Sequence, residues 1–179
     1  MSVAALKSAL ESHGLLGSSI IPKSFNPDVF VRVLYLRSNV AVSPGELLGV
    51  QKTQEEPRVS FETHQDDPEH YTLALLDPDA PSKSDPKWAP FRHWLITGVR
   101  PGEPARFGEV LTSYMGPAPP AGTGPHRYAY LLYRQPAHAA PKLHGNPERR
   151  SFDIASFVKE NKLELVGANF FVSENQDKK

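Results

Sequence analysis

Apolar residues near the start of the chain recur at helical spacing. Ser2 is placed to cap a first turn and Gly14 is a typical helix end, so the pattern predicts a short amphipathic helix over residues 3–13. Such a helix is too short to be stable alone in water, so its apolar stripe must pack on its own domain or on a partner. The stripe consists of Val3, Leu6 and Leu10.

Strand patterns cover most of the remaining chain. Residues 28–37 alternate β-branched or aromatic residues with polar ones, and residues 58–64 repeat this more weakly, which predicts two strands. Near the end, residues 151–161 predict a helix and residues 163–172 a closing strand. Three further runs are almost continuously apolar, as is typical of central strands covered on both faces: residues 71–77, 91–99 and 127–135.

Eighteen prolines and twelve glycines gather between these runs, especially in residues 78–90, 101–104 and 116–125. Proline seldom enters a central strand, so these segments are predicted loops. A chain of 179 residues with 39% hydrophobic content is suited to one domain with a full core. We therefore predict a single, mostly β domain over residues 1–179 with peripheral helices, in which residues 1–24 form an N-terminal helical extension.

Composition excludes several classes of partner and site. Twenty Lys and Arg balance twenty Asp and Glu without a dense basic block, so nucleic acid is not a predicted partner. The absence of cysteine excludes disulfides, zinc thiolate sites and a thiol nucleophile. No apolar run approaches the roughly 20 residues of a transmembrane segment, and the start lacks the pattern of a signal peptide. A cytoplasmic protein is the simplest expectation, with a vacuolar or membrane-peripheral location as alternatives.

Two proline-stiffened loops, each beside an apolar strand, carry the polar residues best suited to a ligand site. In the first loop, Asp77 and Asp79 flank Pro78, and an extended backbone there would point both carboxylates the same way. Both are therefore ligand-binding candidates. The alternative is an Asp-Pro turn that ends the strand, with the carboxylates accepting backbone N–H groups.

Strand alternation assigns nearby side chains to faces. It places His126 and Tyr128 together, with Arg127 on the opposite face in a scaffold salt bridge. A single histidine among apolar neighbours is more often a core residue than a functional one, and this alternative applies to His93. On its strand, alternation puts Phe91, His93 and Leu95 on one face and Arg92, Trp94 and Ile96 on the other.

Taken together, these side chains indicate an anion site. Gly122 and Gly124 leave backbone N–H groups open to an anion, and imidazoles can donate to phosphate oxygens. An aspartate can orient a histidine or meet an ammonium group, so the set is suited to a zwitterion such as a phosphoethanolamine head. We expect His93 and His126 to donate to an anionic oxygen, with Asp77 orienting one of the rings.

Metal and catalytic chemistry have weaker support. Asp77, His93 and His126 could form a set of two histidines and one carboxylate, but no metal-binding spacing accompanies them, so neither a metal nor another cofactor is predicted. Acyl transfer would need an activated nucleophile beside a base, and the chain has no Gly-x-Ser-x-Gly elbow. The chain is therefore not predicted to be an enzyme.

The two loops and the strand between them resemble the phosphatidylethanolamine-binding protein family. The matching motifs are Asp77-Pro-Asp79-Ala-Pro81 with Ser82-Lys-Ser-Asp-Pro86, then His93, then Gly122-Thr-Gly124-Pro-His126-Arg127-Tyr128. With Ser43-Pro-Gly upstream, the similarity covers residues 25–172. The resemblance implies an antiparallel β-sandwich, a cis bond at Ala80–Pro81 and a small cavity for anionic or phosphoryl head groups. By matching positions, its lining is Asp77, His93, Pro119, Pro120, His126 and Tyr128.

Within the family the chain is most similar to the fungal carboxypeptidase Y inhibitors, through residues 114–120, 131–136, 160–166 and 168–171. This resemblance implies a non-catalytic binding protein that modulates a partner, either a serine carboxypeptidase or a signalling protein, and that also binds a phospholipid head group. It favours partner contact for Val3, Leu6 and Leu10 over docking on the domain. The alternative function is a small hydrolase that uses the Asp and His residues of the pocket.

Overall fold

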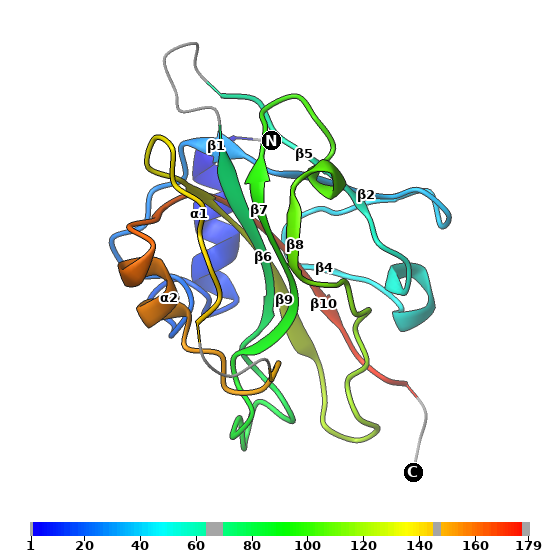
Figure 1. The fold of residues 1–179 in the computed structure, drawn as a ribbon. Helices are drawn as coiled ribbons and strands as arrows, with labels where there is room; N and C mark the ends of the chain where they lie inside the picture. The colour runs from blue at the N-terminus through cyan, green and yellow to red at the C-terminus, as the bar shows by residue number, and fades with distance from the viewer. Residues whose placement is uncertain (1, 64–69, 145–147, 177–179) are drawn as a thin grey trace.

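The computed structural model describes residues 2–63, 70–144 and 148–176, which fold into two β-sheets and a layer of helices (Figure 1). The helices are α1 (Val3–Ser12), α2 (Ile154–Glu160) and the 3-10 helices η1 (Val50–Thr53) and η2 (Ala105–Phe107). The strands are β1 (Val29–Phe30), β2 (Arg32–Tyr35), β3 (Val40–Ala41), β4 (Glu46–Leu47), β5 (Arg58–Ser60), β6 (Tyr71–Asp77), β7 (Phe91–Val99), β8 (Glu109–Thr112), β9 (His126–Arg134) and β10 (Glu164–Ser173).

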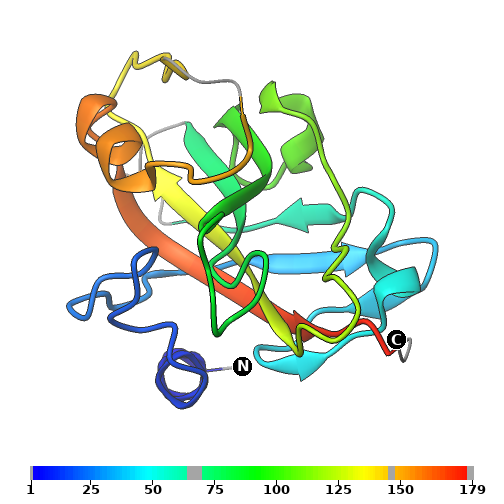
Figure 2. The same ribbon diagram turned by 90° about the horizontal axis from the view of Figure 1, so that it is seen from below.

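The larger sheet has the strand order β1-β10-β9-β6-β7-β8, with β4 also paired to β10, and the smaller sheet has the order β3-β2-β5. The prediction of a mostly β sandwich is confirmed. Pairing is antiparallel except where the short strands β1 and β4 run parallel to β10. Helices α1 and α2 lie on one side of the larger sheet and the smaller sheet on the other (Figure 2).

The central strands are covered on both faces, as their apolar runs predict, and all seven residues of β6 are buried. We call the cluster between the two sheets the sandwich core; it includes Tyr35, Phe61, Trp94, Tyr130 and Phe171. We call the cluster beneath the helices the helix-side core; it includes Leu6, Leu10, Leu76, Phe157 and Phe170.

The predicted strand over residues 28–37 is interrupted at Val31. Here the chain leaves β10, to which β1 is paired, and enters the smaller sheet as β2. The predicted strand over residues 58–64 is reduced to β5, and residue 64 lies outside the described residues. The hydrophobic pattern does not predict β3, β4 and β8, because strands of two to four residues are too short to show an alternation of apolar and polar positions.

The N-terminal helix forms where it is predicted. The hydroxyl of Ser2 accepts from the Ala5 N–H, and Gly14 follows the helix with a φ of 64°, a backbone conformation that glycine adopts without strain. Leu6 and Leu10 are only 1% and 0% exposed within the helix-side core, while Val3 is partly buried. The prediction that Leu6 and Leu10 contact a partner is therefore wrong, because their apolar surface is already covered by the domain.

The rest of the N-terminal segment also packs into this core, through Leu15, Ile20 and Ile21. Near the other end, α2 starts three residues later than predicted, where the Asp153 carboxylate caps it by accepting from the Ser156 N–H. In the described part of the chain, neither helix combines the length and apolar character that crossing a membrane demands.

Candidate functional site

The end of β6 and the starts of β7 and β9 meet at one end of the larger sheet (Figure 1). They bring Asp77 beside His126. Nδ1 of His126 lies 2.8 Å from Oδ2 of Asp77, and both side chains are buried. Because the carboxylate accepts, the ring donates through Nδ1. The other oxygen of Asp77 accepts from the Asp79 N–H at 2.7 Å. Asp77 thus orients an imidazole, as predicted.

Thr123 contacts the second nitrogen of this imidazole. Its Oγ1 lies 3.0 Å from Nε2 of His126 and donates to the Pro120 carbonyl at 2.8 Å. A hydroxyl has one hydrogen, and Thr123 uses it in the bond to the Pro120 carbonyl. Toward the imidazole, the hydroxyl can then only accept. Both nitrogens of the His126 ring therefore face an oxygen atom, Nδ1 that of Asp77 and Nε2 that of Thr123. A ligand can reach Nε2 of His126 only by displacing Thr123.

His93 lies at a bulge in β7 that alternation does not anticipate. Leu75 pairs with Trp94 while Leu76 pairs with Arg92, so the residue between them has no partner in β6. The guanidinium of Arg92 consequently lies 4.5 Å from the Phe152 ring of the helix-side core, whereas Trp94 belongs to the sandwich core. The predicted grouping of Arg92 with Trp94 is wrong, because the extra residue shifts the alternation.

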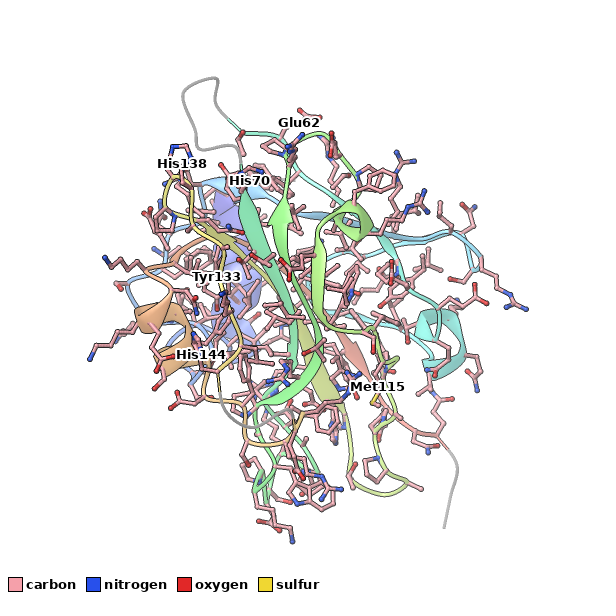
Figure 3. All side chains as sticks on the ribbon, viewed as in Figure 1. Glu62, His70, Met115, Tyr133, His138 and His144 are labelled. Carbon is pink, nitrogen blue, oxygen red and sulfur yellow. The ribbon has the colours of Figure 1, made fainter. Side chains whose placement is uncertain are left out.

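The bulge directs the His93 ring to the carbonyl of Met115, which Figure 3 labels on the segment after β8. Nδ1 lies 2.8 Å from this oxygen, and since a carbonyl only accepts, Nδ1 carries the hydrogen. Burial is the main influence on the ring and lowers the pKa of His93, against the Met115 bond and Asp77, which raise it. In the neutral ring Nε2 therefore carries a lone pair, and donation from His93 to an anion stays a prediction, since it requires the protonated ring.

Tyr128 lies between the two histidines. Its ring packs edge-on against the His93 ring, with 5.2 Å between the ring centroids, and stacks on the His126 ring, with 6.3 Å between the centroids. The three rings therefore form a row. Burial, with a smaller contribution from Asp77, raises the pKa of Tyr128, so its hydroxyl keeps its hydrogen. Among the described residues neither this hydroxyl nor Nε2 of His93 has a hydrogen-bond partner, yet neither is among the fully buried atoms that lack one. Both atoms therefore reach solvent.

Asp79 faces the other side of the sheet. Its two oxygens accept from the Arg127 guanidinium at 2.6 and 2.9 Å and from the Arg127 N–H at 2.8 Å. Arg127 also donates to the carbonyls of His13 and Gly14 at the end of α1, at 2.9 Å each. The scaffold role of Arg127 is confirmed. The prediction that Asp77 and Asp79 point together is wrong, because the chain turns between them instead of staying extended.

The proline and glycine positions shape the second loop. Pro119 is buried and Pro120 exposed, while Gly122 and Gly124 have φ values of 77° and 76°, which favour glycine. The cis bond expected at Ala80–Pro81 is present, and Ala89–Pro90 is also cis.

Three groups that contact the histidines of the site were not predicted from the sequence. Thr123 could have been suspected from its place between two glycines of the motif. The Met115 carbonyl and Arg149 carry no local signal, although the guanidinium of Arg149 donates to the carbonyls of Arg92 and His93. In the described ranges, no three His, Asp or Glu side chains come together in a way that could hold a metal ion.

A separate cavity of about 580 Å³ opens over the smaller sheet and contains none of these residues. Its walls are mainly apolar, from Phe30, Leu34 and Val42 among others, with Arg32 and Arg58 beside them. Volume alone would place a site there. The free polar atoms of His93 and Tyr128 mark the other end of the molecule instead, and we rely on them because specific recognition requires directed polar groups.

A family model and known sequences match this chain. The family model described as phosphatidylethanolamine-binding protein matches residues 37–171. The Carboxypeptidase Y inhibitor of Saccharomyces cerevisiae is 32% identical, over 93% of this chain and 93% of its own length. Protein BROTHER of FT and TFL 1 of Arabidopsis thaliana is 38% identical, over 70% of this chain and 68% of its own length.

Comparison with solved structures agrees. The crystal structure of carboxypeptidase Y inhibitor complexed with the cognate proteinase superposes with a TM-score of 0.81 at 32% identity, covering 97% of each chain. The phosphatidylethanolamine-binding protein from Plasmodium vivax shares the fold, with a TM-score of 0.77 at 22% identity over 94% of this chain and 97% of its own.

Proposed function

This chain belongs to the phosphatidylethanolamine-binding protein family, and on that premise we propose that it is a non-catalytic binding protein that inhibits a serine carboxypeptidase. The observation that carries the proposal is the similarity to carboxypeptidase Y inhibitor over nearly the full length of both chains, in sequence and in fold. A signalling protein is the alternative partner, and a failure to inhibit any serine carboxypeptidase would favour it.

We propose that the exposed face of α1 contacts the protease. Leu6 and Leu10 anchor the helix in the domain, and Arg127 binds the carbonyls of His13 and Gly14 directly after it, so its outer residues are presented in a fixed orientation. A preformed surface of this kind loses little conformational entropy on binding. The exposed residues of α1 are Ala4, Ala5, Ser8, Glu11 and Ser12.

The test is inhibition of purified carboxypeptidase Y by the full chain and by two matched variants. Ala5→Arg places a long charged side chain on the exposed face of α1, and Ala155→Arg does the same on exposed α2. Arginine is a good helix former, so neither variant should unfold. We expect Ala5→Arg to weaken inhibition at least tenfold and Ala155→Arg to leave it unchanged. Equal inhibition by both would reject the α1 contact, and no inhibition by the wild type would reject the function.

We propose further that the row of rings binds a phosphoryl anion, free or as a phospholipid head group. The Tyr128 hydroxyl supplies a donor, and His126 becomes a second donor if Thr123 moves. Tyr128→Phe removes only the hydroxyl, and we expect it to weaken the binding of inorganic phosphate about tenfold or more, since a hydrogen bond to a charged group contributes about 1.5–3 kcal/mol. Tyr133→Phe is the control, because Tyr133 lies in the helix-side core (Figure 3).

A hydrolase is the second candidate, favoured by the hydrogen-bonded order Asp77, His126, Thr123 with distances of 2.8 and 3.0 Å. Such an order can activate a hydroxyl as a nucleophile. Here the hydroxyl hydrogen of Thr123 is directed at Pro120 instead, which opposes activation. Ester hydrolysis by the pure protein that disappears in Thr123→Val would support the hydrolase and contradict the binding protein.

A further inference from the structure

The cavity of about 580 Å³ over the smaller sheet shares no residue with the row of rings and lies beside β1, the edge strand of the larger sheet. Its volume is within the range of roughly 300–1,000 Å³ that is typical of small-molecule sites. The cavity offers mainly apolar contact, because apolar residues that are at most 7% exposed line much of it: Leu6, Val31, Val33, Val42 and Ala168.

Two arginines lie where β2 and β5 line the cavity. Arg32 on β2 lies opposite Ser60 on β5, and Arg58 is two residues earlier on β5, so the two arginines are diagonal neighbours on one face of the smaller sheet. Arg32 pairs with Glu62 at the exposed surface. Arg58 has no hydrogen-bond or ion-pair partner in the described part of the chain, and none of the described residues that line the cavity is acidic. This part of the cavity therefore offers a positive charge to an anionic group.

The buried amide of the cavity is already hydrogen-bonded within the protein. Asn169 on β10 donates to the carbonyls of Val31 and Val42 at 2.9 and 3.3 Å, and it accepts from the Phe170 N–H at 2.8 Å. Backbone groups of paired strands point at the neighbouring strands and not out of the face of the sheet. A peptide on these walls would bring an N–H and a C=O with each residue and leave them without partners. A hydrocarbon chain has no such groups, so it fits these walls better than a peptide.

We infer that this cavity binds a single-chain fatty acid, whose tail lies on the apolar walls and whose carboxylate pairs with Arg58. The planar guanidinium matches a carboxylate in a bidentate pair. The tail supplies most of the affinity, since each buried CH₂ group raises it about fourfold, and the ion pair fixes the end at which the carboxylate lies. The site goes beyond the proposed function, because it is separate from the row of rings and its ligand has no phosphoryl group.

The test is calorimetry on the full chain with octanoate, decanoate and dodecanoate, each below the concentration at which it forms micelles. We expect each lengthening by two CH₂ groups to raise the affinity on the order of tenfold, up to the length that fills the cavity. 1-Decanol has the chain length of decanoate without its charge, and it should bind about fivefold more weakly, as the loss of an exposed ion pair predicts. No binding of dodecanoate, or an affinity that does not depend on chain length, would overturn the inference.

Matched variants test the location of the site. Ala41 is exposed and lines the cavity, so Ala41→Glu places a carboxylate on the wall where the tail lies. We expect it to weaken dodecanoate binding at least tenfold, and Ala155→Glu on exposed α2 to leave it unchanged. Arg58→Gln should weaken binding about fivefold, whereas Arg37→Gln, at an exposed position outside the cavity, should have no effect. Wild-type affinity in both Ala41→Glu and Arg58→Gln would overturn the site.

Two further measurements separate this site from the phosphoryl site. Inorganic phosphate should not displace dodecanoate, and displacement would place the fatty acid at the rings and contradict the inference. If Ala41→Glu does not fold, NMR of the wild type decides. We expect nuclear Overhauser contacts between the tail of dodecanoate and the methyl groups of Leu34 and Val42, and contacts with Tyr128 instead would overturn the inference. Inhibition of carboxypeptidase Y is measured independently, so either proposal can fail alone.

Discussion

At the start of β9, two neighbouring side chains on opposite faces of the sheet each pair with an aspartate, but the two pairs have different roles. His126 and Arg127 are neighbours in sequence, and each pairs with one aspartate of the same loop, at 2.8 and 2.6 Å. On the helix side, Arg127 also donates to the carbonyls of His13 and Gly14. On the other side, Nε2 of His93 and the Tyr128 hydroxyl have no hydrogen-bond partner among the described residues. Satisfied groups hold a fold together, whereas unsatisfied groups leave a place for a ligand.

The largest expected effect is on the helix side. Asp79→Ala leaves the Arg127 guanidinium largely buried without its counter-ion, and breaking a buried pair from one side costs about 3–5 kcal/mol. Urea denaturation should show this loss in the free energy of unfolding. Asp85→Ala is the matched control, because its pair with Lys87 is exposed and should contribute less than about 1 kcal/mol. Similar losses in the two variants would show that the pair does not anchor the fold.

A comparable loss is expected from the helix that Arg127 holds. Leu10 is 0% exposed, so Leu10→Ala should lower the free energy of unfolding by about 2–5 kcal/mol. Leu47 is 57% exposed and provides the control, because Leu47→Ala should change the free energy of unfolding by less than about 0.5 kcal/mol. For the same reason we expect deletion of residues 1–12 to destabilise the domain. A truncated protein that melts with the wild type would contradict the anchoring of α1.

The pocket side should respond less. Thr123→Val removes the hydroxyl that bridges Pro120 and His126, and each net hydrogen bond contributes about 0.5–1.5 kcal/mol. Thr123→Ser keeps the hydroxyl and should retain most of the stability. Both can be followed by chemical denaturation. If Thr123→Val cost as much as Asp79→Ala, the pocket side would be structural as well, and the contrast between the two faces would fail.

The smallest expected effect is on how steeply the free energy of unfolding changes with pH. Burial holds the pKa of His93 below its ordinary value of 6.5, so below about pH 6.5 the unfolded chain binds more protons than the folded one. This contribution to stability is complete above pH 6.5 and is lost as the pH falls through the lowered pKa. Unfolding free energies measured from pH 7.5 down to pH 5 should therefore fall less steeply in His93→Phe than in the wild type. Parallel curves would mean that the ring is not buried in its neutral form.

Local residue patterns were enough to predict several of the strands and helices. β6 and β7 have the predicted bounds because central strands must be apolar on both faces, and α1 lies between the cap and the glycine that mark its ends. The sequence pattern also placed His126 and Tyr128 on one face, with Arg127 opposite. The motifs that fix the family lie in two continuous stretches, so one chain was enough to identify them.

Which polar atoms lack a hydrogen-bond partner among the described residues depends on contacts between distant parts of the chain. The bulge at His93 depends on how β7 registers with β6, and Asp79 turns away from Asp77 to meet a residue 48 positions later in the chain. The accepting character of His93 comes from a carbonyl 22 residues away, and α1 is an anchor because the domain covers its leucines. Hydrogen-bonding character and burial are set by neighbours in space, and local periodicity carries no information about them.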